Sequence, residues 1–187
     1  MITEDTQMSR IEKTIEVAAP VDAVYGQWTQ FESFPSFMDG VTRVEQLDDR
    51  TLAWEARVAG RTKTWTARIT DQTPDERVAW MAVDGAQNDG AVTFRNLGEG
   101  RTEVRLVVDA DPEGVVEEVG DRLGILDRRV GGDLERFREF IEGRGAPTGR
   151  WSGEIHGDEV SSGTRVDVTQ PSTVALHHPD GDTGAGR

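Results

Sequence analysis

The sequence predicts an α+β fold in which a curved antiparallel sheet of about seven strands packs on one long C-terminal helix. Three observations predict it. An alternating strand pattern opens the chain, a series of short alternating segments separated by turn residues follows, and a long apolar stripe at helical spacing comes last. An antiparallel sheet with one apolar face needs a cover, and the long helix supplies it.

The first part of the chain predicts a strand and then two short helices. Residues 9–17 alternate between apolar and polar side chains, which is typical of a half-buried strand. Pro20 begins a helix, because proline is tolerated at the first helical position, and one face of this helix is apolar up to Trp28. An aromatic segment, residues 31–38, follows and is interrupted by Pro35.

The middle of the chain predicts an antiparallel meander. Turn signals rich in Asp, Gly and Pro separate short segments in which apolar and polar residues alternate. The predicted strands span residues 41–47, 51–58, 61–70, 77–83, 91–97 and 101–109.

A long helix is predicted from residue 113 to about residue 142. Its apolar stripe consists of Val116, Val119, Leu123, Leu126, Val130, Leu134, Phe137 and Ile141. Gly120, Gly124 and Gly131 lie on one flank of the stripe. Because glycine weakens a helix by about 1 kcal/mol relative to alanine, the three indicate either close packing or a space left beside the helix.

Composition separates a domain from its extensions. Residues 1–8 are expected to be a flexible N-terminus and residues 9–145 the folded domain. Residues 146–187 form an acidic tail rich in Gly, Thr and Asp, which is expected to be mostly disordered because it has few apolar residues to bury. Trp151 and Ile155 stand out in this tail as either an accidental pair or a short motif that docks on the domain or on a partner.

Charge and composition exclude several classes of partner. The chain has 35 acidic and 21 basic residues, so its net charge is −14, which disfavours nucleic acids and anionic membranes. No apolar run approaches the ~20 residues that span a bilayer, and the N-terminus shows no secretory signal, so a cytoplasmic location is expected. The absence of cysteine excludes disulfides and thiolate chemistry.

Several local strings, in this order and at this spacing, resemble the SRPBCC superfamily, whose START domains have the helix-grip fold. The nearest branch is similar to polyketide cyclase/dehydrase and coenzyme-Q-binding START-type proteins. The resemblance covers residues 9–145 and rests on residues 15–25, 31–38, 64–69, 77–80, 90–94 and 134–137.

The resemblance implies an apolar cavity between the sheet and the long helix. Its expected lining is Trp54, Ala56, Trp65, Ala67, Trp80, Val92, Phe94, Leu106, Val108, Leu123, Leu126 and Val130. Alternation of tryptophan with alanine on the dry strand faces suits a shaped pocket. At Trp80 the strand does not alternate cleanly, and Met81 competes for the inward position. For each of these residues, ordinary core packing is the alternative.

Few residues qualify for chemistry. His156, His177 and His178 all lie beyond the domain, which argues against a Ser-His pair, a histidine zinc site or any other metal site within it; no cofactor is expected. Lys13 and Asn96 have inward parity and are candidate polar anchors, with a lysine extending to solvent and a strand-end cap as the alternatives. Aromatic polyketide cyclases of the superfamily use inward Arg and Tyr, for which Arg68 and Tyr25 are the weak candidates here. Arg68 is expected on the face opposite Trp65, which counts against cyclase chemistry.

These observations favour a protein that binds or carries a hydrophobic small molecule of aromatic, polyketide or isoprenoid type. One alternative is an aromatic polyketide cyclase or dehydratase. Another is a stress-related interaction protein that recruits a partner through Trp151 and Ile155. A homodimer stays open.

Overall fold

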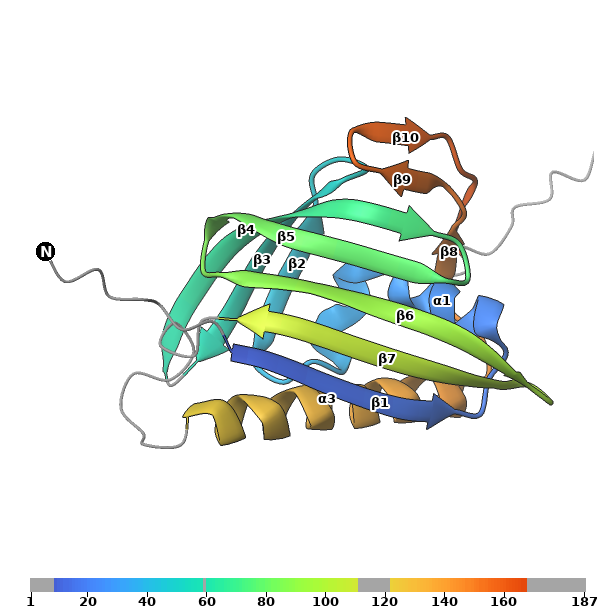
Figure 1. Cartoon of the computed structure of the whole chain (residues 1–187), viewed down its shortest axis with the longest axis horizontal. Helices are drawn as coiled ribbons and strands as arrows, with labels where there is room; N and C mark the ends of the chain where they lie inside the picture. Colours follow the sequence, from blue (N-terminus) through green and yellow to red (C-terminus); the bar gives the residue numbers. More distant parts are fainter. Residues whose placement is uncertain (1–8, 59, 111–121, 168–187) are drawn as a thin grey trace, which may run out of the picture.

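A curved sheet wrapped on one long helix forms the body of the protein (Figure 1). The computed structural model describes residues 9–58, 60–110 and 122–167. In chain order the elements are β1 (Ser9–Val17), α1 (Val21–Trp28), the 3₁₀ helix η1 (Phe31–Ser36), β2 (Val41–Gln46), β3 (Thr51–Val58), β4 (Arg61–Thr73), β5 (Arg77–Gly85), β6 (Asn88–Gly98), β7 (Arg101–Ala110), α3 (Arg122–Arg144), β8 (Gly149–Trp151), β9 (Glu154–His156), β10 (Glu159–Ser161) and β11 (Arg165–Asp167).

The main sheet is antiparallel throughout. Within the described ranges it has nine strands, which follow the order β1-β7-β6-β5-β4-β3-β2 with β9 and β10 added beside β4. The first strand pairs with β7 along its whole length, from Ser9 opposite Ala110 to Val17 opposite Thr102. This architecture confirms the predicted α+β class, with an antiparallel sheet against a C-terminal helix.

Irregular pairing of β4 helps to bend the sheet. The register between β4 and β5 shifts twice, between Thr66 and Ala67 and again between Ile69 and Asp71. Such bulges bend a strand and increase its twist. They also explain why β5 does not alternate cleanly in sequence, and why Trp80 rather than Met81 faces inward.

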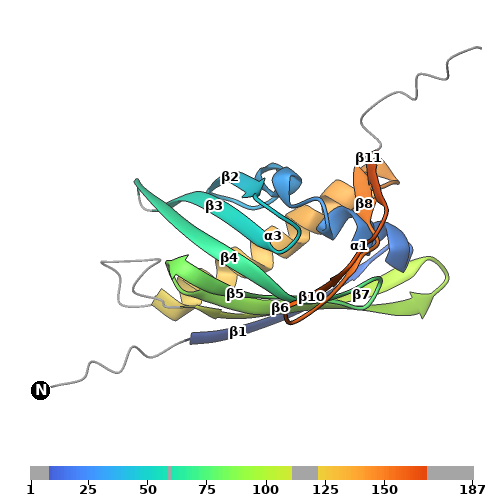
Figure 2. The same cartoon turned by 90° about the horizontal axis from the view of Figure 1, so that it is seen from above.

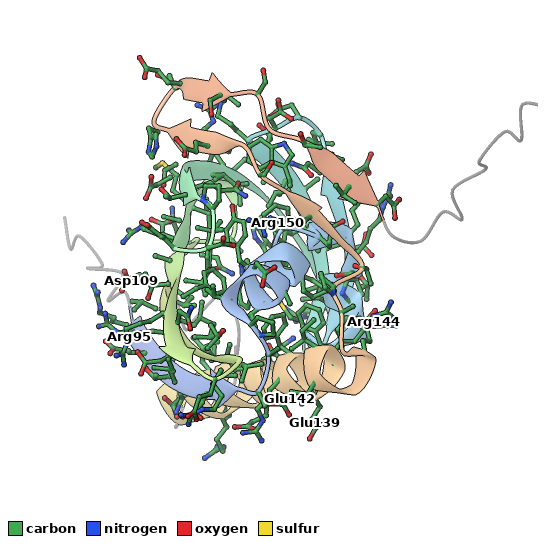
Figure 3. All side chains as sticks on the ribbon, turned by 90° about the vertical axis from the view of Figure 1, so that its right-hand side faces the viewer. Arg95, Asp109, Glu139, Glu142, Arg144 and Arg150 are labelled. Atoms are coloured by element: carbon green, nitrogen blue, oxygen red, sulfur yellow. The ribbon has the colours of Figure 1, made fainter. Side chains whose placement is uncertain are left out.

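The two faces of the sheet have opposite character. On the outer face, ion pairs join neighbouring strands, such as Arg95 with Glu103 at 2.7 Å and Arg105 with Glu12 at 2.8 Å. Arg95 and Asp109 lie on this side in Figure 3, pointing away from α1. The inner face is apolar, so burial of this face against the helix, and not the exposed ion pairs, supplies most of the stability.

The long helix α3 closes the inner face. Figure 2 shows it running across the concave side of the sheet, between the β1–β7 edge and the β2–β3 edge. The predicted stripe faces inward, and its buried members are Leu126, Val130, Leu134, Phe137 and Ile141. Residues 111–121, where the start of this helix was predicted, lie outside the described residues.

The expectation of disorder after residue 145 is wrong for residues 146–167, which form β8 to β11. β3 pairs with β4 only as far as Arg68, and β9 pairs with β4 beyond that point, at Asp71 and Gln72. Composition gave the wrong expectation because side chains of this segment pack into the core of the domain. Ile155 is fully buried and Trp151 is 6% exposed. Residues 1–8 and 168–187 lie outside the described residues.

Polar contacts also fix the C-terminal segment, residues 146–167, to α1. The buried Gln27 donates to Thr148 Oγ1 at 3.1 Å, and Gln27 Oε1 accepts from the Thr148 amide at 2.8 Å. Arg150 places its guanidinium 5.8 Å from the centre of the Tyr25 ring; Figure 3 shows this arginine beside α1. None of the helices in the described ranges is long and apolar enough to cross a membrane.

Candidate functional site

A cavity of about 170 Å³ lies between the concave face of the sheet and α3. Residues from α1, η1, β2 to β7 and α3 line it: Trp28, Phe31, Phe34, Met38, Asp39, Val41, Leu52, Trp54, Ala56, Lys63, Trp65, Ile69, Val78, Trp80, Ala86, Gln87, Asn88, Leu106, Val108, Ala110, Leu126, Arg129, Val130 and Asp133. Of these, Asp39 and Gln87 are exposed. They mark the mouth of the cavity, between the turn before β2 and the β5–β6 hairpin.

Stacked indoles form one wall. Trp54 and Trp65 stand directly opposite each other on β3 and β4, and side chains at such positions come into contact. Their rings are 5.6 Å apart and tilted by only 10°, a parallel stack. Phe34 lies against the stack, with its ring centre 5.7 Å from that of Trp54. The stack and Phe34 all line the cavity, so this wall is aromatic.

A third indole, that of Trp80, is held in place by a glycine and an asparagine. A Cβ atom built on Gly90 would come within 2.5 Å of Trp80 Cζ2 and 2.7 Å of the Val107 carbonyl oxygen. Only glycine therefore lets the Trp80 ring lie across β6. Trp80 Nε1 also lies 3.4 Å from Asn88 Oδ1, a weak hydrogen bond that steadies the ring.

Many of the predicted lining positions face this cavity. They are Trp54, Ala56, Trp65, Trp80, Leu106, Val108, Leu126 and Val130. Whether they contact a ligand stays a prediction. The side chain of Leu123 lies outside the described part of the chain.

Ala67, Val92 and Phe94 were predicted to line the cavity but lie outside its lining. The reason is that the cavity occupies only one end of the concave face. Phe94 packs in the other end, with its ring centre 5.6 Å from that of Tyr25 and 6.1 Å from that of Trp28. Val92 is 0% exposed and Ala67 is 1% exposed, so both are buried.

The predicted polar anchors are also elsewhere. Lys13 Nζ pairs with Asp127 Oδ2 at 2.7 Å. The Lys13 stem lies along Gly131, whose missing Cβ would be 3.5 Å from Lys13 Cε. A Cβ at Gly131 would thus make only an ordinary van der Waals contact, and the neighbour of Gly131 is the Lys13 stem rather than the cavity. Asn96 is exposed, and its Oδ1 accepts from the Gly98 amide at 2.8 Å, which is the strand-end cap.

Neither weak catalytic candidate lines the cavity. Arg68 is exposed on the opposite face of β4. Tyr25 is fully buried behind Phe94, and its hydroxyl accepts from Gln72 Nε2 at 3.0 Å. Burial raises the pKa of Tyr25 to about 12, although the Gln72 hydrogen bond opposes this shift. A hydroxyl of such low acidity, outside the cavity, is not placed for proton transfer to a ligand there.

Ionisable groups that the sequence reasoning missed do line the cavity: Asp39, Lys63, Arg129 and Asp133. Asp133 is largely enclosed, with 15% of its side chain exposed. Its spacing from Leu126 and Val130, seven and three residues, places it on the same helix face, and this signal was present in the sequence.

Opposing effects act on the Asp133 carboxyl. Burial raises its pKa, while the Asp39 amide, which donates to Oδ1 at 2.9 Å, and the neighbouring Arg136 and Arg129 lower it. Burial dominates, so the pKa lies above its ordinary value of 3.8. The cavity therefore contains a carboxyl that holds its proton more tightly than a carboxyl in water does.

The described residues give no support to two other kinds of site. Across residues 9–58, 60–110 and 122–167, no group of three or more His, Asp or Glu side chains could hold a metal ion. Trp151 and Ile155 are buried within the domain, so they are not available to recruit a partner. That hypothesis is corrected: the pair docks on its own domain.

Comparison with known proteins gives the same fold. An uncharacterized 17.2 kDa protein from the melC2–rnhH intergenic region of Streptomyces lincolnensis is 51% identical over 149 residues, 79% of this chain and 99% of that protein. The Zhui aromatase/cyclase from Streptomyces sp. R1128 has a TM-score of 0.61 at 22% identity, over 74% of this chain and 96% of that one. A START superfamily protein from Mycobacterium smegmatis has a TM-score of 0.58 at 18% identity, over 74% and 97%.

These two structures establish likeness of fold. Residues 17–139 match the family described as polyketide cyclase/dehydrase and lipid transport. This match covers most of the predicted domain, and it confirms the resemblance seen in the sequence. The chain belongs to the polyketide cyclase/dehydrase and lipid transport family.

Proposed function

We propose that the protein binds a hydrophobic small molecule, with an aromatic ring or rings, in the cavity between the sheet and α3. One observation carries the proposal: a cavity of about 170 Å³ walled by aromatic side chains from three strands, α1 and η1. Burying an apolar ligand there removes its surface from water, at roughly 25 cal/mol per Å². Membership of a family that includes lipid transport supports the same function.

The size of the cavity limits the part of a ligand that is enclosed. An engineered apolar cavity of about 150 Å³ holds one benzene ring, so 170 Å³ suits a small ring system. A longer molecule, such as an isoprenoid or an extended polyketide, would have to pass out between Asp39 and Gln87. We therefore expect one- and two-ring compounds to bind within the cavity and longer chains to project from the mouth.

Two measurements test this function. The first is mass spectrometry of an organic extract of the purified full-length protein, which is expected to contain a bound hydrophobic compound. The second is titration with 1,4-naphthoquinone, followed by quenching of tryptophan fluorescence, because Trp54, Trp65 and Trp80 all line the cavity. Absence of an extractable compound together with no saturable quenching would contradict the proposal.

A second function, cyclisation or dehydration of a polyketide, is favoured by one observation. Asp133 lines the cavity and burial raises its pKa, which are the properties of a group that can donate and accept protons near a bound ligand. In this reading Asp133 replaces Tyr25 and Arg68 as the residue that acts on the substrate. Asp133→Asn would then change the products of a reconstituted polyketide pathway. If the products stay the same with the variant, or without the protein, this second function is wrong.

We further propose a cytoplasmic location, on the basis of the sequence, and a stoichiometry of one ligand per chain. We also propose that the protein forms a homodimer. Light scattering of the full-length protein would measure its mass, for comparison with the 20.6 kDa of one chain. A mass of one chain at all concentrations would remove the homodimer and leave the ligand site intact, because the cavity is built from one chain.

A further inference from the structure

The turn that joins η1 to β2 forms one side of the cavity mouth. Met38 and Asp39 line the cavity, and Asp39 is exposed. We call residues 37–40 the rim turn. Its first residue, Phe37, is buried against Phe137 and Phe140, with ring centres 5.2 and 5.4 Å apart. The start of the rim turn is therefore anchored in the core, whereas its tip borders solvent.

Hydrogen bonds from α3 hold the rim turn down. Arg129 Nη2 donates to the Asp39 carbonyl oxygen at 2.6 Å, and the Asp39 amide donates to Asp133 Oδ1 at 2.9 Å. Arg136 Nε donates to the Phe37 carbonyl oxygen at 3.0 Å, and its guanidinium also pairs with Asp133. Arg136 thus fixes both the rim turn and the carboxylate that binds it.

Two glycines leave room for these arginines. Gly40 has a φ of +79°, and a Cβ atom there would lie 2.1 Å from Arg129 Nη2. A Cβ atom on Gly132 would lie 3.2 Å from Arg136 Nη1. Side chains at these two positions would crowd the guanidinium groups that hold the rim turn.

Arg136 differs from the other two residues in one respect: Arg129 and Asp133 line the cavity, whereas Arg136 does not. We propose that Arg136 is a positioning residue that keeps the rim turn closed over the cavity and thereby sets how fast a ligand enters and leaves. This inference rests on the proposed function, because it assumes that a ligand enters the cavity. It adds a separate claim, that Arg136 controls the rates of ligand entry and exit without contacting the ligand.

The helix offers a matched control. Arg136 and Arg138 each pair with an acidic residue three positions earlier, Asp133 and Glu135 respectively. Arg136→Gln and Arg138→Gln therefore remove the same kind of ion pair from the same helix. Of the two, Arg136 is the one with a hydrogen bond to the rim turn.

Stopped-flow fluorescence with 1,4-naphthoquinone gives the decisive comparison. In Arg136→Gln, the association and dissociation rate constants are both expected to rise about fivefold, the effect of one ordinary hydrogen bond, with Kd changed much less. Arg138→Gln is expected to match the wild type. Unchanged rates in Arg136→Gln, or a weaker Kd with an unchanged association rate, would overturn the inference.

Amide hydrogen exchange without ligand separates this inference from the proposed function. The Asp39 amide is bonded to Asp133, so its exchange is expected to be several-fold faster in Arg136→Gln and unchanged in Arg138→Gln. If no quinone binds but exchange rises as expected, the proposed function fails and Arg136 still holds the rim turn. If exchange at Asp39 is the same in all three proteins, the role of Arg136 is refuted.

Discussion

Replacing Ala56 by leucine tests whether the space beside β3 is empty. Ala56 is 3% exposed and lines the cavity. Leucine adds three carbon atoms, which would enter the cavity without displacing a neighbour. In a filled core the same change would force side chains and backbone apart.

The two cases differ in the sign of the change in unfolding free energy. Burial of a methylene group contributes about 0.8 kcal/mol, so three added carbons in an empty apolar space stabilise the fold by about 1 to 2 kcal/mol, since contact with the walls is incomplete. Overpacking of a filled site destabilises it by about 1 to 3 kcal/mol. Ala56→Leu is therefore expected to raise the unfolding free energy.

Ala67→Leu is the matched control. Ala67 is 1% exposed on the adjacent strand β4 and lies outside the cavity lining, so leucine there is expected to lower the unfolding free energy. Urea unfolding followed by tryptophan fluorescence measures both variants. Equal destabilisation of the two would show that the space beside Ala56 is not empty, and the reasoning would fail.

Other predictions address the groups around the cavity. The folded state raises the pKa of Asp133. The folded protein therefore gains unfolding free energy from protonated Asp133 at acidic pH, and it loses this contribution as the pH rises through the raised pKa. Asp133→Asn stays neutral, so urea unfolding is expected to show it gaining stability relative to the wild type with rising pH; a pH-independent difference would contradict this. Tyr25→Phe is expected to leave quinone binding unchanged and to lower the unfolding free energy by about 1 kcal/mol, because Gln72 loses its acceptor; weaker binding would place Tyr25 in the site after all. Trp151→Ala is expected to cost about 3 kcal/mol of unfolding free energy, the cost of deleting a buried tryptophan; a change below about 1 kcal/mol would show that the C-terminal segment does not share the core.

Local periodicity made much of the fold predictable. Alternation along β1 and β3 and the stripe from Leu126 to Ile141 both report which side of an element is buried. The opposition of Trp54 and Trp65 follows from a short hairpin between β3 and β4, which fixes their register. These features depend on neighbours in sequence, so the sequence alone can reveal them.

The limits of the cavity depend on contacts between distant elements. Phe94 shares the parity of the lining residues, yet Tyr25 and Trp28 from α1 surround it. The alternation of apolar and polar residues within β6 contains no information about where α1 packs. Asp133 shows a different failure: its helical position was visible, but a charged side chain is usually assigned to the solvent face.

The C-terminal segment was missed for a third reason. Its composition has too few apolar residues for a core of its own, which is why disorder was expected. Its order comes instead from the free edge of β4 and from Gln27 on α1. A segment that completes a neighbouring sheet needs only one or two buried side chains, here Trp151 and Ile155.

Calorimetric titration of the full-length protein with 2-naphthol tests the central claim most directly. The claim predicts one site per chain, with a negative heat-capacity change from burial of apolar surface. It further predicts affinity at least tenfold weaker in Ala56→Leu and unchanged in Ala67→Leu. No measurable binding to the wild type, or equal binding to both variants, would contradict a ligand site between the sheet and α3.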